Sequence, residues 1–229
     1  MGDCVAIIPA RGGSKGIPGK NLLTVAGKPL VAWSIEHALN SSKIDSVWVT
    51  SDSVEILAVA ETFGAKAILR PESISGDKAS SEEAWIHAVN EIQKNVKVDL
   101  VVCMQPTSPI RGRDDLDEAV AQYFSGNFDS ILSVTKIEDH FEWCLTSEGA
   151  VSTNYDFKKR RRRQDIEVKY LENGSFYLIS PELLIESNDR LGGKVGLYEQ
   201  EKYKMYQIDN FEDINLCEAI LNGYGLNEK

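Results

Sequence analysis

Short apolar runs alternate with longer segments of helical periodicity along the first 135 residues of the chain. The first apolar run, residues 5–10, is bounded by glycines, which is typical of a strand buried on both faces of a parallel sheet. The runs that predict strands are residues 5–10, 46–51, 66–69, 99–104 and 129–135. The segments that predict helices are residues 29–39, 54–63, 80–94 and 114–124.

Local signals mark the ends of these predicted helices. Pro29 suits the first position of a helix, and Gly64 suits a C-terminal cap. Ser80 and Glu83 have the spacing of a capping box. Repeated strand–helix–strand units need right-handed crossovers and give a parallel sheet covered on both faces. The sequence therefore predicts a three-layer, Rossmann-like α/β fold with a mostly parallel sheet.

The alternation ends near residue 137. Residues 137–180 hold a basic run and the stretch YLENGSFYLI, which we interpret as hairpins or an excursion out of the main sheet. Two more β-like stretches, residues 196–200 and 204–208, precede an amphipathic helix over residues 212–221. Since no linker or repeat interrupts the chain, we expect one domain over residues 1–229 with an inserted β-rich arm.

Charge and cysteine content exclude several classes of protein. The 229 residues include 25 Lys and Arg against 35 Asp and Glu, a net charge of −10, so a nucleic-acid-coating role lacks its electrostatic driving force. The four cysteines lie far apart without a C-x-x-C pair, which argues against a zinc site or a disulfide framework. No apolar run approaches the ~20 residues of a membrane span, and no signal peptide is evident. We expect a reduced, cytoplasmic protein without a membrane partner.

A glycine-rich basic loop, residues 9–21, follows the first predicted strand. Its glycines allow backbone N–H groups to approach an anion, and its cations match a polyphosphate. Residues 1–28 hold four basic residues and one acidic residue: Arg11, Lys15, Lys20 and Lys28 against Asp3. Neither Walker A nor G-x-G-x-x-G spacing fits, because Ser14 occupies a required glycine position. We interpret the loop as a site for a small anionic ligand rather than as a solvated turn.

Seven motifs along the chain carry a resemblance to a known family: IIPARGGSKGIPGKN at residues 7–21, VTSDS at 49–53, RPESISGDKASS at 70–81, MQPTSPIR at 104–111, RRQD at 162–165, ENGSFYLI at 172–179 and IDNFED at 208–213. With them the chain resembles the cytidylyltransferases that activate sialic acid and related nine-carbon acid sugars. The first and fourth are highly specific together. The resemblance implies transfer of CMP from CTP to the anomeric hydroxyl of an N-acylneuraminate, legionaminate or pseudaminate, with release of pyrophosphate.

The resemblance also implies the residues that bind the nucleotide. These are Arg11, Gly12, Gly13, Ser14, Lys20, Asn21, Arg70 and Ser81. It implies catalytic roles for Arg11, Lys20 and Asp209. Cations around the phosphates agree with this chemistry, because phosphoryl transfer relies on positioning and on neutralising charge at the reacting oxygens and the departing group. No residue stands out as an obligatory general base.

The sugar-binding residues implied by the resemblance are Gln105, Thr107, Arg163, Asn173 and Tyr177. Gln105 and Thr107 follow a predicted core strand, which is where open α/β sheets bind ligands. A forked guanidinium at Arg163 suits a carboxylate. Arg163 ends a run of basic residues from Lys158, which is also compatible with a solvated face or with nucleic acid. In the family the segment that holds Asn173 and Tyr177 takes part in dimer formation, so we expect a homodimer.

Two positions depart from the family pattern. Family members commonly carry Asp-x-Asp before the last helix as Mg²⁺ ligands, whereas this chain has Gln207-Ile208-Asp209. We expect Asp209 to bind Mg²⁺, unless it only begins the helix, and the number of ions stays open. Trp143 stands where bacterial sialic acid enzymes can place a lysine. It favours a more apolar acid sugar, such as legionaminic or pseudaminic acid, or a dimer interface.

Two other functions compete with this interpretation. A cytidylyltransferase for the eight-carbon sugar Kdo shares the fold but usually has a different loop and carboxylate pattern. A nucleotide-binding protein that has lost catalysis is the second, and Gln207 is the residue that suggests it.

Overall fold

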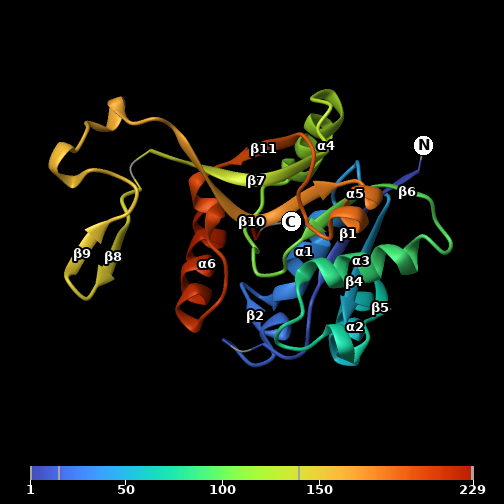
Figure 1. Cartoon of the computed structure of the whole chain (residues 1–229). Helices are drawn as coiled ribbons and strands as arrows, with labels where there is room; N and C mark the ends of the chain where they lie inside the picture. The colour runs from blue at the N-terminus through green and yellow to red at the C-terminus, as the bar shows by residue number, and fades with distance from the viewer. Residues whose placement is uncertain (1, 15, 139, 228–229) are drawn as a thin grey trace.

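The structure, a computed structural model, describes residues 2–14, 16–138 and 140–227, apart from the side chain of Arg163. Its centre is a seven-stranded sheet with the order β11-β7-β10-β6-β1-β4-β5 (Figure 1). The strands are β1 (Asp3–Pro9), β4 (Ser46–Ser51), β5 (Lys66–Leu69), β6 (Val98–Met104), β7 (Ser130–Ile137), β10 (Lys169–Ile179) and β11 (Val195–Gln200). All neighbouring pairs are parallel except the two that β10 makes with β6 and β7. The mostly parallel sheet confirms the predicted fold class.

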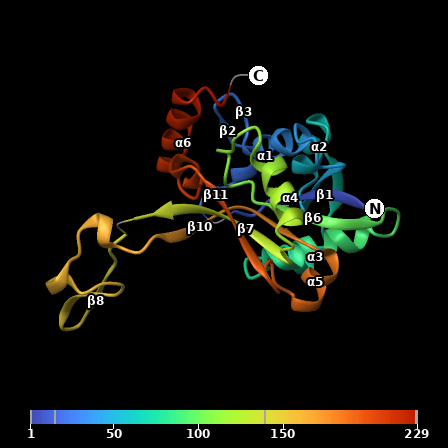
Figure 2. The same ribbon diagram turned by 90° about the horizontal axis from the view of Figure 1, so that it is seen from above.

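Helices cover both faces of this sheet (Figure 2). They are α1 (Leu30–Leu39), α2 (Val54–Thr62), α3 (Ser81–Ile92), α4 (Asp115–Ser125), α5 (Pro181–Ser187) and α6 (Phe211–Gly223). Helices α1, α2 and α4 pack on the face that includes Ala6 and Ile8, while α3 and α5 pack on the face that includes Val5 and Ile7. Successive β1 side chains thus bury in opposite layers, because side chains alternate along a strand.

Helix α6 lies outside the two main helical layers. It packs with α1 and with a short hairpin of β2 (Thr24–Val25) and β3 (Lys28–Pro29) around a third apolar cluster that includes Trp33 and Leu221. Short 3-10 helices complete the described elements: η1 (Lys20–Leu22), η2 (Glu72–Ile74), η3 (Phe157–Lys159), η4 (Arg163–Asp165) and η5 (Lys202–Met205). None of the helices in the described part of the chain has the length and apolar character needed to cross a membrane.

Most predicted elements lie within two or three residues of those observed. The expected strands over residues 46–51 and 66–69 have those bounds in the structure. The capping box of Ser80 and Glu83 is present at the start of α3. Gly64 follows α2 with φ at 91°, in the left-handed region that favours glycine at a helix end.

The expected excursion over residues 137–180 is too long. Residues 169–179 form β10, which lies between β6 and β7 in the main sheet. Only the chain between β7 and β10 leaves the body, and we call residues 140–168 the arm. It holds the hairpin of β8 (Trp143–Thr146) and β9 (Gly149–Ser152), which stands clear of the sheet in both views (Figures 1 and 2).

The β-like stretch predicted over residues 204–208 is not a strand. Its first residues belong to η5, and the rest is an extended segment outside the sheets. The Lys204 side chain is buried in an ion pair with Asp115, and the Tyr203 ring stacks on Tyr224. These contacts turn the chain away from the edge strand β11 and toward the ends of the parallel strands.

Candidate functional site

The candidate site lies at the carboxyl ends of strands β1, β4, β5 and β6. Because these strands are parallel, the loops that follow them meet at one edge of the sheet, where open α/β folds bind ligands. A cavity of about 470 Å³ opens there. Nine residues predicted from the sequence line it: Arg11, Ser14, Lys20, Asn21, Arg70, Ser81, Gln105, Thr107 and Asp209.

The other predicted residues have different placements. Gly12 and Gly13 belong to the same loop but do not line the cavity. Lys15 and the side chain of Arg163 lie outside the described residues. Asn173 and Tyr177 lie on β10 and do not line the cavity either.

The glycine-rich loop after β1 is fastened by contacts to neighbouring strand ends. Gly12 N–H donates to Oδ1 of Asp52 at 2.9 Å, and Arg11 donates to the carbonyl oxygen of Gly76 at 3.3 Å. The Asn21 side chain donates to the carbonyl oxygen of Arg11 at 3.0 Å, while its own Oδ1 is buried without a hydrogen-bond partner among the described residues. That Oδ1 is therefore an acceptor available to a ligand donor.

A second part of the loop packs against the segment before α6. The Lys20 ammonium donates to the Ile208 carbonyl oxygen and to Oδ1 of Asp209, each at 2.9 Å. A Cβ added at Gly16 would lie 2.4 Å from the Asp209 carbonyl oxygen, so this position admits only glycine without movement of the loop. Gly16 is thus the loop glycine that a close contact requires, and that contact is with the protein's own backbone.

Arg70 supplies a buried cation to the cavity. It follows β5, is only 6% exposed, and lies 3.7 Å from Oδ1 of Asp52. Burial lowers the pKa of the Arg70 guanidinium, and the Asp52 carboxylate opposes that shift. Its Nε has no hydrogen-bond partner among the described residues, so it retains a donor that an anionic ligand would satisfy.

Asp52 is a residue of this site that the sequence interpretation did not assign. It binds both the Gly12 backbone and Arg70, and so fixes the glycine-rich loop against β4 and β5. Its position directly after the β4 strand was the available signal, because strand ends in this topology face the ligand.

The first turn of α3 forms another wall. Ser80 caps the helix and Ser81, its first residue, lines the cavity beside it. The N-terminal end of a helix carries partial positive charge from its free N–H groups, which favours an anion. Glu82 in the same turn pairs with Arg190, which anchors this end of the helix to the chain after α5.

The turn of Gln105 and Thr107 is held from beneath by Arg111. The Arg111 guanidinium is fully buried and donates to the carbonyl oxygens of Gln105 and Ser175, at 2.8 and 2.7 Å, and to Oγ of Ser34 at 2.9 Å. Burial lowers the pKa of Arg111, and the Asp115 carboxylate acts in the opposite direction. Arg111 thereby ties the end of β6 to β10 and α1.

Asn173 and Tyr177 support strand β10 in place of lining the cavity, with exposed fractions of 2% and 1%. The Asn173 Oδ1 accepts from Ser133, and its Nδ2 donates to Gln200. The Tyr177 hydroxyl donates to Glu172 at 2.5 Å, and its ring packs against Trp85. Their side-chain polar groups are used within the fold, so within this chain the structure does not bring them to the nine cavity residues.

The side chains of Asp209 and Gln207 determine how this site could hold the expected Mg²⁺. Asp209 has a side chain 70% exposed at the cavity, whereas the Gln207 amide is turned to the Asn173 carbonyl oxygen. The described residues contain no group of three or more His, Cys, Asp or Glu that could hold a metal ion by themselves. One carboxylate together with phosphate oxygens and water is a donor set that suits Mg²⁺. Asp209 therefore fits a metal ion that arrives with a phosphate-bearing ligand.

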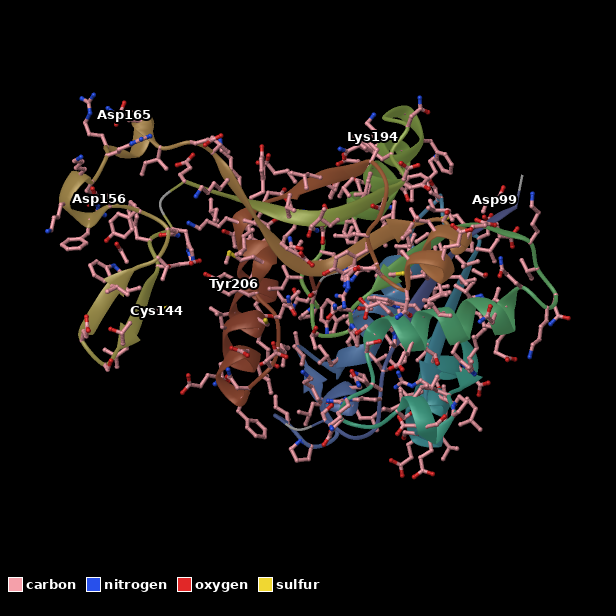
Figure 3. The ribbon with its side chains drawn as sticks, in the orientation of Figure 1. Asp99, Cys144, Asp156, Asp165, Lys194 and Tyr206 are labelled. Atoms are coloured by element: carbon pink, nitrogen blue, oxygen red, sulfur yellow. The ribbon has the colours of Figure 1, made fainter. Side chains whose placement is uncertain are left out.

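The arm carries exposed aromatic and aliphatic side chains. Trp143 packs against Tyr155 and Phe157, and all three lie away from the 470 Å³ cavity of the same chain. Leu145 at the hairpin is 88% exposed. Cys144, Asp156 and Asp165 mark the arm in Figure 3, well separated from the sheet. A role for Trp143 next to a bound ligand would therefore require a second chain.

Comparisons with known proteins agree with the fold and the motifs. A cytidylyltransferase family profile matches residues 5–227. An N-acylneuraminate cytidylyltransferase of Oncorhynchus mykiss is 37% identical over 215 residues, 92% of this chain and 48% of that protein. A pseudaminic acid cytidylyltransferase of Campylobacter jejuni is 30% identical over 220 residues, 94% of this chain and 95% of that protein. The chain thus spans about half the length of the first relative and nearly all of the second.

A solved structure shares the whole architecture. The CMP:2-keto-3-deoxy-manno-octonic acid synthetase complexed with CTP superimposes with a TM-score of 0.72, covering 97% of this chain and 99% of that one, at 17% identity. At this identity the likeness shows the fold alone.

Proposed function

Because the chain belongs to the cytidylyltransferase family, we propose that it transfers CMP from CTP to the anomeric hydroxyl of a nonulosonic acid and releases pyrophosphate. The acid sugar is an N-acylneuraminate, a legionaminate or a pseudaminate. Relatives named for N-acylneuraminate and for pseudaminic acid both match over more than nine-tenths of the chain, which supports the nine-carbon class without selecting one member.

The observation that carries this proposal is the composition of the 470 Å³ cavity. Three cations line it together with the first turn of α3: Arg11 and Lys20 from the glycine-rich loop, and Arg70 from the end of β5. Gln105 and Thr107 also line it and offer hydrogen-bonding groups. A triphosphate on the cationic side would leave an acid sugar to the Gln105 side, with the α-phosphorus between them.

The proposed reaction is a displacement at the α-phosphorus of CTP. The anomeric oxygen forms a bond to the α-phosphorus as the bond to the bridging oxygen breaks, and pyrophosphate leaves with that electron pair. The hydroxyl proton passes to solvent. Arg11 and Lys20 would hold the phosphates and stabilise charge on the departing pyrophosphate. Positioning by the Gln105–Thr107 turn would supply much of the rate enhancement.

Mg²⁺ is part of this proposal. When bound, it would neutralise phosphate charge and favour departure of pyrophosphate. Asp209 is the residue that would hold it, with phosphate oxygens as the other ligands. The donor set described above supports one such ion.

The proposal includes a homodimer in the cytoplasm. Exposed Leu145, Trp143 and Phe157 give the arm an apolar surface suited to a second copy of the chain. The partner's arm would then bring Trp143 and the basic run of residues 158–163 toward the sugar end of the cavity. The described cysteines are all free thiols, three of them buried, which agrees with a reducing compartment.

The Kdo alternative shares only the fold of the CTP-bound neighbour, whereas the 30–37% identical relatives are named for other sugars. The inactive alternative rested on Gln207, and the cavity retains Arg11, Lys20 and Asp209 together. Both observations favour an active enzyme for a nine-carbon acid.

The test is pyrophosphate release with CTP and Mg²⁺ from a panel of N-acetylneuraminic, legionaminic, pseudaminic and Kdo acids. We expect turnover with a nine-carbon acid, and loss of that turnover in Arg11→Ala and Lys20→Ala. Turnover with Kdo alone would establish the alternative, and CTP binding without turnover on any acid would support an inactive homologue.

A further inference from the structure

Gln207 links Thr107, which lines the cavity, to strand β10 behind it. Its Nε2 donates to the carbonyl oxygen of Asn173 at 2.6 Å, and its Oε1 accepts from the Thr107 hydroxyl at 3.3 Å. The next residue extends the link, since Ile208 N–H donates to the Thr107 carbonyl oxygen at 2.8 Å. The segment before α6 is thus bonded to the Gln105–Thr107 turn and to β10.

Strand β10 is shaped to admit this amide. Its pairing with β7 shifts register between Glu172 and Tyr177, and Gly174 inside that irregularity has φ at 66°. A Cβ added at Gly174 would lie 2.6 Å from Nε2 of Gln207. The left-handed backbone conformation therefore favours glycine at position 174, and a Cβ there would displace the Gln207 amide.

We propose that Gln207 is a positioning residue that holds Thr107 and Asp209 in the positions needed for CMP transfer. It is not the remnant of a metal ligand. The inference rests on the proposed function. Gln207 acts through Thr107, which lines the cavity, and through the two-residue step to Asp209, which is fixed in turn by Lys20.

The chemistry of the side chain supports an amide at this position. A carboxylate accepts hydrogen bonds but has no donor, so it would place an oxygen against the Asn173 carbonyl oxygen. Aspartate is also one methylene shorter and would not span Thr107 and Asn173. A half-buried acceptor placed against another acceptor loses the hydrogen bond that the amide makes, which displaces the segment.

The first experiment compares Gln207→Glu and Gln207→Asp with the wild type. Gln93→Glu makes the same change at an exposed site at the end of α3 and is the matched control. We expect both Gln207 variants to lower kcat at least about 30-fold with KM for CTP within about 3-fold, because the Gln207 side chain contacts Thr107 and strand β10 and not the glycine-rich loop directly. Gln93→Glu should match the wild type. Thermal unfolding of each variant separates a folding defect from this effect.

The second experiment is titration of the CTP-bound protein with Mn²⁺, followed by electron paramagnetic resonance. If Gln207 positions Thr107, then Gln207→Asp will not tighten Mn²⁺ binding. A tenfold gain in Mn²⁺ affinity, or a gain in turnover, in Gln207→Asp would overturn the inference and identify position 207 as a vacant ligand position.

A third measurement does not depend on turnover and so separates this inference from the proposed function. In ¹⁵N-labelled protein, the side-chain amide signal that disappears in Gln207→Glu belongs to Gln207. We expect its exchange with water to be at least about tenfold slower than that of the exposed Gln93 amide. Equal exchange rates would refute the inference even if the enzyme were active, and slow exchange would support it even if every acid in the panel failed.

Discussion

The Lys20 ammonium and the Asp209 carboxylate lie 2.9 Å apart and join the loop after β1 to the segment before α6. The Lys20 side chain is 13% exposed and also donates to the Ile208 carbonyl oxygen. A nucleotide that draws Lys20 to its phosphates would free the Asp209 oxygen for a metal ion. Binding of the nucleotide and of the metal would therefore reinforce each other.

We expect Lys20→Met to lower kcat/KM for CTP at least about 100-fold, since it removes a cation from the phosphate side of the cavity. Lys20→Arg keeps the positive charge but changes the shape of the charged group, so kcat/KM for CTP should fall less than in Lys20→Met. Steady-state kinetics over a range of Mg²⁺ concentrations measures both. Retention of more than about a tenth of wild-type kcat/KM by Lys20→Met would show that Lys20 does not serve the phosphates.

Gly16 and Gly13 offer a matched pair in one loop. A Cβ at Gly16 would lie 2.4 Å from the Asp209 carbonyl oxygen, whereas a Cβ at Gly13 would meet nothing within 4 Å. Gly16→Ala should therefore lower the free energy of unfolding of the ligand-free protein by about 1–3 kcal/mol, the usual range for overpacking. Gly13→Ala should stay within about 0.5 kcal/mol of wild type. Equal urea-denaturation curves for the two variants would contradict this packing of the loop.

Removal of the buried Arg111 guanidinium should destabilise the protein. Arg111→Met leaves the carbonyl oxygens of Gln105 and Ser175 without this donor, and loss of a buried hydrogen-bonding group on this scale amounts to about 2–5 kcal/mol. Arg113→Met removes the same charge from an exposed position two residues away and is the control. Urea denaturation measures both, and similar midpoints would refute a structural role for Arg111.

His37 should make stability depend on pH. Desolvation lowers the pKa of His37 to about 3, with Arg111 and Lys28 acting in the same direction and Asp115 opposing them. The unfolded chain binds a proton near pH 6.5, so this contribution to stability is complete above that pH and is lost as pH falls toward 3.

The variant that tests this is His37→Gln. Between about pH 6.5 and 4 its free energy of unfolding should fall less steeply than that of the wild type, by up to about 1.4 kcal/mol per pH unit. Urea denaturation at several pH values gives both slopes. Parallel slopes would show that His37 does not stay neutral in the folded protein.

If the arm forms the proposed dimer interface, a charge introduced on its apolar surface should disrupt the dimer. Leu145→Asp places a carboxylate in the middle of its apolar surface and should convert the dimer to a monomer in light scattering. Val54→Asp is the control, because Val54 is 71% exposed at the start of α2, far from the arm in sequence and outside its apolar cluster. A wild-type monomer, or a dimer that survives Leu145→Asp, would refute this use of the arm.

The main sheet was predictable because most of its strands are uninterrupted apolar runs with clear ends. Strand β10 was not, because the polar residues Asn173 and Ser175 are both buried in it, and the Asn173 side chain is satisfied by Ser133 and Gln200, far along the chain. A pattern of polar and apolar residues cannot distinguish a buried polar residue with such partners from a turn.

Some residues of the candidate site could also be predicted from the sequence, and others could not. Gln105 and Thr107 could be placed because they follow a core strand, where open α/β sheets bind ligands, whereas Arg70 was assigned from the family resemblance. The supporting contacts of Arg111 and Gln207 could not, because they join segments 34 to 100 residues apart through side chains on different elements. Asn173 and Tyr177 matched a motif, but the motif does not say which side of β10 is occupied by the fold.

The pairing of Lys20 with Asp209 spans 189 positions of the chain. During synthesis the loop after β1 leaves the ribosome long before its partner segment exists. A nascent chain that ends before residue 209 would hold most of the strands yet would lack one side of the cavity. Completion of the cavity therefore waits until the segment before α6 has been synthesised and can pack against the loop after β1.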